Sequence, residues 1–143
     1  MRDIIFRAKV KRPAKPILGE ILPDGTWVYG ELHATSRVPH IHDTPFSKQP
    51  IDPETVGQYI GVKDKDGNKI FEGDIIESHS LSGDIARHRI GFDGSMGCYI
   101  AILLIGQQAG YFFQLGQNWL IGYGKMVTGN VYDNPELLKG GEE

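Results

Sequence analysis

The chain has 143 residues, of which 40% are hydrophobic and 23% are charged, and its net charge is -3. This composition excludes a disordered chain and predicts one compact domain with a hydrophobic core, spanning residues 1–143. The longest apolar run, 99–105, is far shorter than the ~18 residues of a membrane span, and the first residues lack a signal-peptide pattern, so we expect a cytoplasmic protein that does not enter membranes. The single cysteine, Cys98, excludes an internal disulfide and a cysteine-rich zinc site within one chain.

Positive charge is concentrated at the start of the chain. Residues 1–15 contain six basic side chains against Asp3, a local charge of +5, so the remainder carries -8. Such an arm can meet the phosphates of a nucleic acid or an acidic face of a neighbouring subunit. The net acidity of the whole chain favours the second, because nucleic-acid binders usually show a broader basic surface. The candidate contact residues of this N-terminal arm are Arg2, Arg7, Lys9, Lys11 and Arg12.

The first third of the chain predicts two strands followed by a long loop. Residues 4–10 largely alternate in polarity and predict a strand that ends before Pro13. A turn at 23–25 then leads into 26–33, a second strand rich in residues favoured on pleated surfaces. Residues 34–50 contain three prolines and no period, which predicts a long surface loop.

The stretch from Asp52 to Glu77 contains three signals of backbone geometry. Asp52 and Pro53 have the residue types of a helix cap and first helical position, so one short helical turn is expected. Residues 58–63 and 69–71 flank an Asp-Gly pair, which predicts a hairpin with Gly67 at a positive φ. A second reversal at Gly73 leads into a strand at 75–78.

The remainder is again dominated by strand patterns. We expect strands at 85–92, 98–105, 111–115 and 126–132, a second short helical turn at 134–138, and a flexible tail at 139–143. Short strands, 19 glycines and no long helical period predict a mainly β fold. The expected form is a strongly bent antiparallel sheet or a small, partly open barrel, of which an SH3-like barrel is one version.

Four blocks of sequence resemble a known family. They are MRDIIFRA (1–8), WVYG (27–30), VGQYIGVKDKDGNKIFEGDII (56–76) and GNVYDNPELL (129–138). In this order they are similar to the YopX family, although Lys9 stands where the family commonly has tryptophan. The resemblance implies an origin in bacteriophages or prophages, hence a bacterial host cell, and a molecular function that is uncharacterised. It transfers no catalytic residue to this chain.

Candidate chemistry is sparse. Asp64, Asp66 and Asn68 imitate the opening of a calcium loop, but the glycine and glutamate that such a loop needs further on are absent. His33, His40 and His42 are the best metal candidates, because residues two apart face the same way on an extended strand. Their spacing lacks the separations of familiar zinc sites. The sequence therefore predicts that the protein has no cofactor and no metal, and a metal bound by these three histidines is a weak alternative. No catalytic constellation was found, and no small-molecule substrate is indicated.

Aromatic residues on the family-like segments give the last candidates. Trp27 and Tyr29 share one face of a predicted strand, and with Tyr59 and the N-terminal arm they form either a core wall or a platform for bases. The leading hypothesis is a non-enzymatic binding or assembly module that associates with itself, because strand-rich chains have edges that self-pairing can cover. The alternatives are a small nucleic-acid-binding barrel and, behind it, a metal-dependent enzyme using the three histidines.

Overall fold

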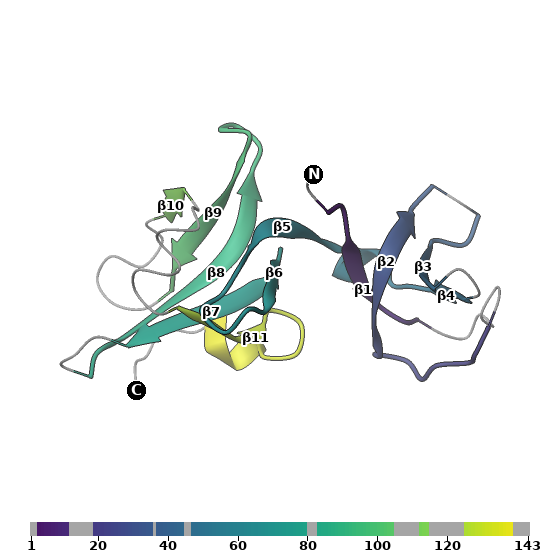
Figure 1. The fold of residues 1–143 in the computed structure, drawn as a ribbon, viewed down its shortest axis with the longest axis horizontal. Helices are drawn as coiled ribbons and strands as arrows, with labels where there is room; N and C mark the ends of the chain where they lie inside the picture. Colours follow the sequence, from purple (N-terminus) through teal and green to yellow (C-terminus); the bar gives the residue numbers. More distant parts are fainter. Residues whose placement is uncertain are drawn as a thin grey trace. The chain divides into compact units, whose positions relative to one another are not determined.

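The structure is a computed structural model that describes residues 3–11, 19–35, 37–44, 47–79, 83–104, 112–114 and 125–138 (Figure 1). The chain divides into two compact units, Met1–Tyr59 and Ile60–Glu143, each of which is taken by itself below. The single domain expected from the sequence remains a prediction. Among the described residues, none of the helices has the length and apolar character to cross a membrane.

The first unit is an antiparallel sheet built from consecutive strands. β1 (Phe6–Lys9), β2 (Trp27–His33), β3 (His40–Thr44) and β4 (Ser47–Pro50) each pair with the next. β5 (Gly57–Lys63) pairs with the other side of β1 and continues into the second unit. The two predicted strands at the start of the chain are therefore confirmed.

The prediction of a loop over residues 34–50 is wrong, because this range contains β3 and β4. Its two described prolines do not interrupt these strands: Pro39 precedes β3, and Pro50 is the last residue of β4. β4 is also the end strand of the order β4-β3-β2-β1-β5-β6, where a missing backbone donor is tolerated. The polar sequence concealed both strands, since Ile41 is the one apolar residue of β3 and β4 together apart from proline.

The core of the first unit lies on one face of this sheet. Ala8, Val10, Val28, Ile41 and Ile51 are buried together, with Phe6, Leu22, Leu32 and Val56 packed against them. The helical turn predicted at Asp52 is confirmed as the 3₁₀ turn η1 (Pro53–Thr55), whose cap is the Asp52 side chain accepting a hydrogen bond from the Glu54 amide at 3.0 Å. Thr55 fixes this turn to β1, because its hydroxyl accepts from the Lys9 amide at 2.9 Å.

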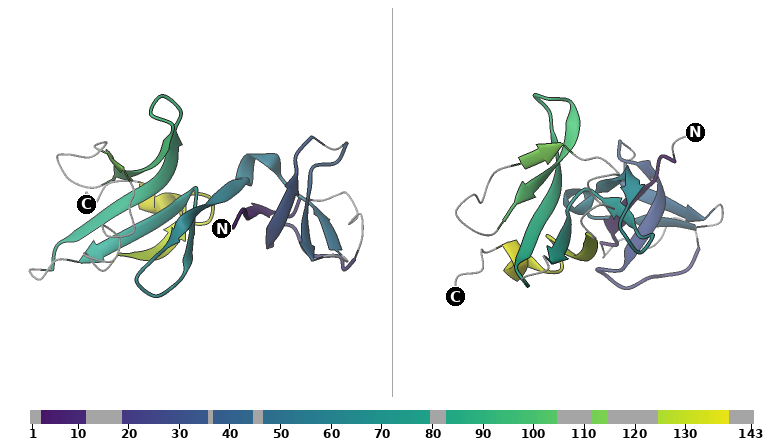
Figure 2. Two further views of the ribbon diagram at one scale, coloured as in Figure 1. Left: turned by 45° about the horizontal axis from the view of Figure 1, so that its top comes forward. Right: turned by 60° about the vertical axis from the view of Figure 1, so that its left-hand side comes forward.

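The second unit holds a separate, five-stranded antiparallel sheet in the order β10-β9-β8-β7-β11. Its strands are β7 (Asp74–His79), β8 (Ile85–Asp93), β9 (Cys98–Leu103), β10 (Phe112–Gln114) and β11 (Met126–Asn130). Figure 2 shows β8 and β9, in green, as a long curved hairpin. β6 (Lys69–Phe71) forms the predicted hairpin with β5, and η2 (Pro135–Leu138) is the predicted second turn.

The fold class predicted from the sequence is confirmed as mainly β with two antiparallel sheets and two isolated 3₁₀ turns. Within the part of the chain that the structure describes, the strands do not close into a barrel. The predicted tail at 139–143 and the outer ends of two predicted strands lie outside the described residues.

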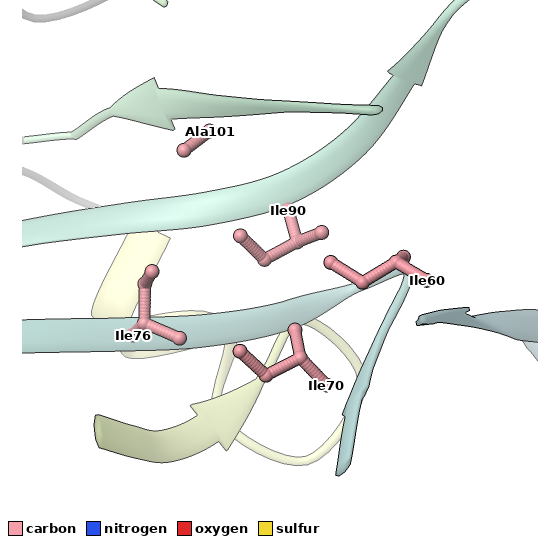
Figure 3. Close-up of a cluster of buried hydrophobic side chains, with 5 residues drawn as sticks. All are labelled: Ile60, Ile70, Ile76, Ile90 and Ala101. Carbon is pink, nitrogen blue, oxygen red and sulfur yellow. The ribbon is translucent and has the colours of Figure 1, made fainter. Parts of the chain in front are cut away.

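The core of the second unit gathers isoleucines from four strands. Ile60, Ile70, Ile76, Ile90 and Ala101 converge between β5, β6, β7, β8 and β9 (Figure 3). Val62, Tyr99 and Val127 pack around them. β-branched side chains suit such a core because they lose little rotamer freedom on a pleated surface.

The hairpin turn between β5 and β6 is built around the Asp64 carboxylate. One oxygen accepts from the amides of Asp66 and Asn68, both at 2.9 Å, and the other accepts from the Val127 amide at 2.9 Å and the Asn68 side chain at 3.2 Å. Gly67 has a φ of +86°, as predicted. Burial alone would raise the pKa of Asp64, but these hydrogen bonds outweigh burial and lower it. The alternation that imitates a calcium loop thus has an architectural role.

Candidate metal centre

The face of the first sheet opposite its core carries polar and aromatic side chains. Because side chains alternate along a strand, this face takes Arg7 and Lys9 from β1, every second residue of β2 from Trp27 to His33, His40 and His42 from β3, and Lys48 from β4. We call it the polar face. It is the surface of the first unit on which the predicted histidines and the predicted aromatic pair both lie.

The register between β2 and β3 brings the three histidines together. His33 stands opposite His40, and Glu31 stands opposite His42. The imidazole rings of His33 and His40 stack at 4.8 Å between centroids, and His42 lies 4.4 Å from His33 and 5.2 Å from His40. One potential ligand atom from each ring lies within 4.8 Å of the others. These three residues, the histidine triad, are therefore one cluster.

Gly30 allows β2 to lie close to the β3 backbone at His42. Its φ is +156°, outside the usual range of residues with a side chain. A Cβ atom at this position would overlap the carbonyl oxygen of His42 and lie 2.9 Å from the carbonyl carbon. The absence of a side chain at Gly30 therefore lets the His42 backbone sit close enough for the triad to form.

One of the three imidazoles, that of His40, is already oriented by a hydrogen bond. The Nδ1 atom of His40 lies 2.8 Å from the carbonyl oxygen of Val38, which can only accept, so Nδ1 carries the proton and Nε2 is left with a lone pair. The Nε2 atom of His33 is buried, and no described group forms a hydrogen bond with it. It faces the Glu31 carboxylate at 3.6 Å, too far for a hydrogen bond.

The surroundings of His42 favour its neutral imidazole. Desolvation, with the neighbouring His33 and Lys48, lowers the pKa of His42 from its usual 6.5, against the opposing influence of Glu31. Near neutral pH its ring is therefore uncharged, which is the form that binds metals. Three imidazole nitrogens are a donor set that suits Zn²⁺ and its neighbours in the transition series.

The other predicted binding residues divide between exposed and buried positions. Arg7 is only 5% exposed and lies 4.7 Å above the Trp27 ring, with the Lys9 ammonium 5.4 Å from the same ring. Tyr29 is 46% exposed, whereas Tyr59 is 7% exposed, and burial raises the pKa of its hydroxyl. Lys11 is exposed, while Arg2 and Arg12 lie outside the described residues. Of the three predicted aromatics, Trp27, Tyr29 and Tyr59, Tyr29 is thus the most exposed.

Sequence reasoning named the triad but missed its surroundings. Glu31 and Lys48 escaped notice because they are single charged residues, and their places beside His42 depend on the register of β2, β3 and β4. Asp43, which follows His42 in the sequence, is not part of the cluster, because consecutive residues of a strand point to opposite faces. One signal in the sequence could have indicated Glu31: it is two residues from His33 on a predicted strand, so the two side chains lie on the same face.

The fold and the triad together define a mainly β protein with a histidine-lined sheet face and two antiparallel sheets. The model of the YopX protein family matches residues 6–139, and the chain belongs to that family. A similar solved structure is the crystal structure of protein EF1440 from Enterococcus faecalis, with 19% identity and a TM-score of 0.53 over 97% of this chain and all of that one. At this identity the likeness concerns the fold. No curated protein matches the chain significantly.

Proposed function

We propose that this YopX protein is a non-enzymatic binding module and that the ligand its polar face suits best is a divalent transition-metal ion of the zinc class. The observation that carries the proposal is the histidine triad, whose ligand atoms lie within 4.8 Å of one another. We place its action in the cytoplasm of a bacterial host, because the family resemblance implies a phage or prophage origin.

The triad needs a local rearrangement of its rings to hold an ion. Zinc–nitrogen bonds of about 2.0–2.1 Å in a tetrahedron put neighbouring donor atoms roughly 3.4 Å apart. The ligand atoms would therefore have to close by roughly 1 Å. The stacked rings of His33 and His40 would also have to turn, because an imidazole lone pair lies in the plane of its ring and parallel rings do not point at one ion. Rotation about the side-chain bonds provides both movements. The Val38 carbonyl supports this movement, since a hydrogen bond to the far nitrogen orients a ligating histidine and increases its basicity.

Zinc titration of chelator-stripped protein tests the proposal directly. Calorimetry and elemental analysis after dialysis are expected to give one zinc ion per chain. The variant His42→Gln, which removes one imidazole, is expected to bind zinc more than about 10-fold more weakly, since even outer-shell changes cost that much.

His79→Gln is the matched control. It removes a half-exposed histidine of the second unit that lies 3.7 Å from Glu77, and it leaves the triad intact. This variant is expected to bind zinc as the unaltered protein does. Equal losses in His79→Gln and His42→Gln, or no uptake by the unaltered protein, would show that the triad is not a metal site.

We further propose that the protein acts as a homo-oligomer, with β4 as the pairing element. β4 is the end strand of its sheet. At one end of its outer edge the Pro50 carbonyl accepts from the Lys11 amide at 3.1 Å, and the rest of that edge pairs with none of the described strands. Lys48 and Pro50 discourage open-ended strand addition, which favours a closed assembly over a filament. Light scattering across a concentration series is the test: a strict monomer at every concentration removes the idea.

A further inference from the structure

Glu31 lies where a fourth ligand of the proposed metal site would have to come from. It stands directly opposite His42 in the β2–β3 register, and two residues before His33 on the same strand. Its carboxylate oxygen lies 3.6 Å from the buried Nε2 atom of His33. That separation is already close to the roughly 3.4 Å between two donors of a tetrahedral zinc ion. In its present position, however, Glu31 is not within 4.8 Å of all three imidazole ligand atoms, so its side chain would have to turn toward them.

The Glu31 side chain is free to complete this movement. It is 73% exposed, so rotating its carboxylate toward the triad displaces water and no packed side chain. A glutamate has three side-chain torsions, and its oxygens bind zinc at about 2.0–2.2 Å. By contrast, His40 is nearly buried and fixed by its bond to Val38. His40 is thus the fixed ligand of the site, and Glu31 is the ligand with the most freedom to move.

Charge on the polar face supports the same assignment. A divalent ion held by three neutral imidazoles keeps its full charge of +2, and Lys48 stands opposite His42 on the neighbouring strand. Arg7 and Lys9 add two more cations to this face. Among the described residues of β1 to β4 whose side chains lie on the polar face, Glu31 is the only acidic one. Its coordination would halve the charge of the bound ion.

We infer that Glu31 is the fourth protein ligand, so that the metal site is a closed His₃Glu tetrahedron with a structural role. This inference rests on the proposed function. Catalytic zinc sites keep one position for water or substrate, whereas structural sites fill all four with protein ligands. A closed site would hold β2 to β3 and would leave no position at which a substrate or an activated water could bind.

Cobalt substitution distinguishes the closed site from an open one. Four-coordinate Co²⁺ absorbs visible light much more strongly than five- or six-coordinate Co²⁺, and a small anion such as azide changes the spectrum where it can reach the ion. The unaltered protein loaded with Co²⁺ is expected to give a strong visible spectrum that azide leaves unchanged. Glu31→Gln is expected to bind Co²⁺ more than about 10-fold more weakly and to respond to azide.

Glu54→Gln serves as the matched control, because it neutralises an exposed acid of the same unit that lies on η1. It is expected to match the unaltered protein in both affinity and spectrum. If the unaltered protein responds to azide, or if Glu31→Gln binds Co²⁺ as tightly, Glu31 is not a ligand while the metal site stands. If the unaltered protein takes up no Co²⁺ at all, the proposed function itself fails.

Discussion

Replacing Gly30 by alanine tests whether the approach of β2 to β3 depends on the missing side chain. The added Cβ would overlap the His42 carbonyl oxygen and lie 2.9 Å from its carbon, where carbon atoms prefer about 3.5 Å or more. β3 would therefore have to retreat by roughly 1 Å, which stretches ladder hydrogen bonds beyond their usual limit of about 3.2 Å. The clash is with backbone, so no side-chain rotation relieves it.

The expected loss in the free energy of unfolding is about 3 kcal/mol. One or two weakened ladder bonds contribute about 1 kcal/mol each, and the unfavourable φ adds about 1 kcal/mol. Gly25→Ala is the matched control: Gly25 also has a positive φ, +83°, but a Cβ there would have nothing within 4 Å. It is expected to cost about 1 kcal/mol, from backbone strain alone.

Urea unfolding followed by circular dichroism measures both variants. A steric clash at Gly30 predicts that the unfolding free energies of the two variants differ by about 2 kcal/mol, which a well-determined unfolding curve resolves. Equal destabilisation would mean that the sheet absorbs the extra methyl group and that Gly30 matters only for its torsion angle. Under the proposed function, Gly30→Ala but not Gly25→Ala should also weaken zinc binding, because it displaces His42.

Two further predictions concern the second unit. Burial, with Lys125 nearby, lowers the pKa of His88 to about 4. As the pH falls, His88 therefore takes up a proton at a higher pH in the unfolded chain than in the folded one. The unfolding free energy should fall by about 2 kcal/mol from pH 7.5 to pH 5. Denaturation curves of His88→Gln should lack this fall, and an unchanged slope would refute the assignment. Asp64→Asn should destabilise by about 2 kcal/mol, because an amide group would meet the Val127 N–H, whereas the exposed Asp66→Asn should change stability by less than about 0.5 kcal/mol.

Local signals made most of the fold predictable. The hairpin at Gly67 and the 3₁₀ turn capped by Asp52 depend on residues within five positions of one another, so the sequence contains all the information needed. The strands of the second unit were visible because their core positions are isoleucines. β3 and β4 were missed for the opposite reason: their positions are almost all polar, and the ladder to β2 supplies the order that composition does not indicate.

The candidate site was predictable only in part for a similar reason. His40 and His42 are two residues apart, which places them on one face of any strand. Bringing His33 opposite His40 requires a particular register across the connection from β2 to β3, and nothing in residues 34–39 fixes that register from sequence alone. The role inferred for Glu31 depends on the same register. A metal site shared between strands is therefore visible only once the pairing is known.

The histidine triad lies in a different part of the sequence from the residues that link the chain to its family. The blocks that resemble the YopX family contain four residues with an architectural role: Gly30, Asp64, Gly67 and Asp74. The Asp74 carboxylate accepts a hydrogen bond from the buried Phe71 amide at 2.8 Å. The three histidines lie outside all four blocks. Family membership therefore accounts for the sheets and implies nothing about a metal. Zinc binding, if measured, would be a property of this chain's own β2–β3 face, and its presence in other members would depend on whether they place histidines in the same register.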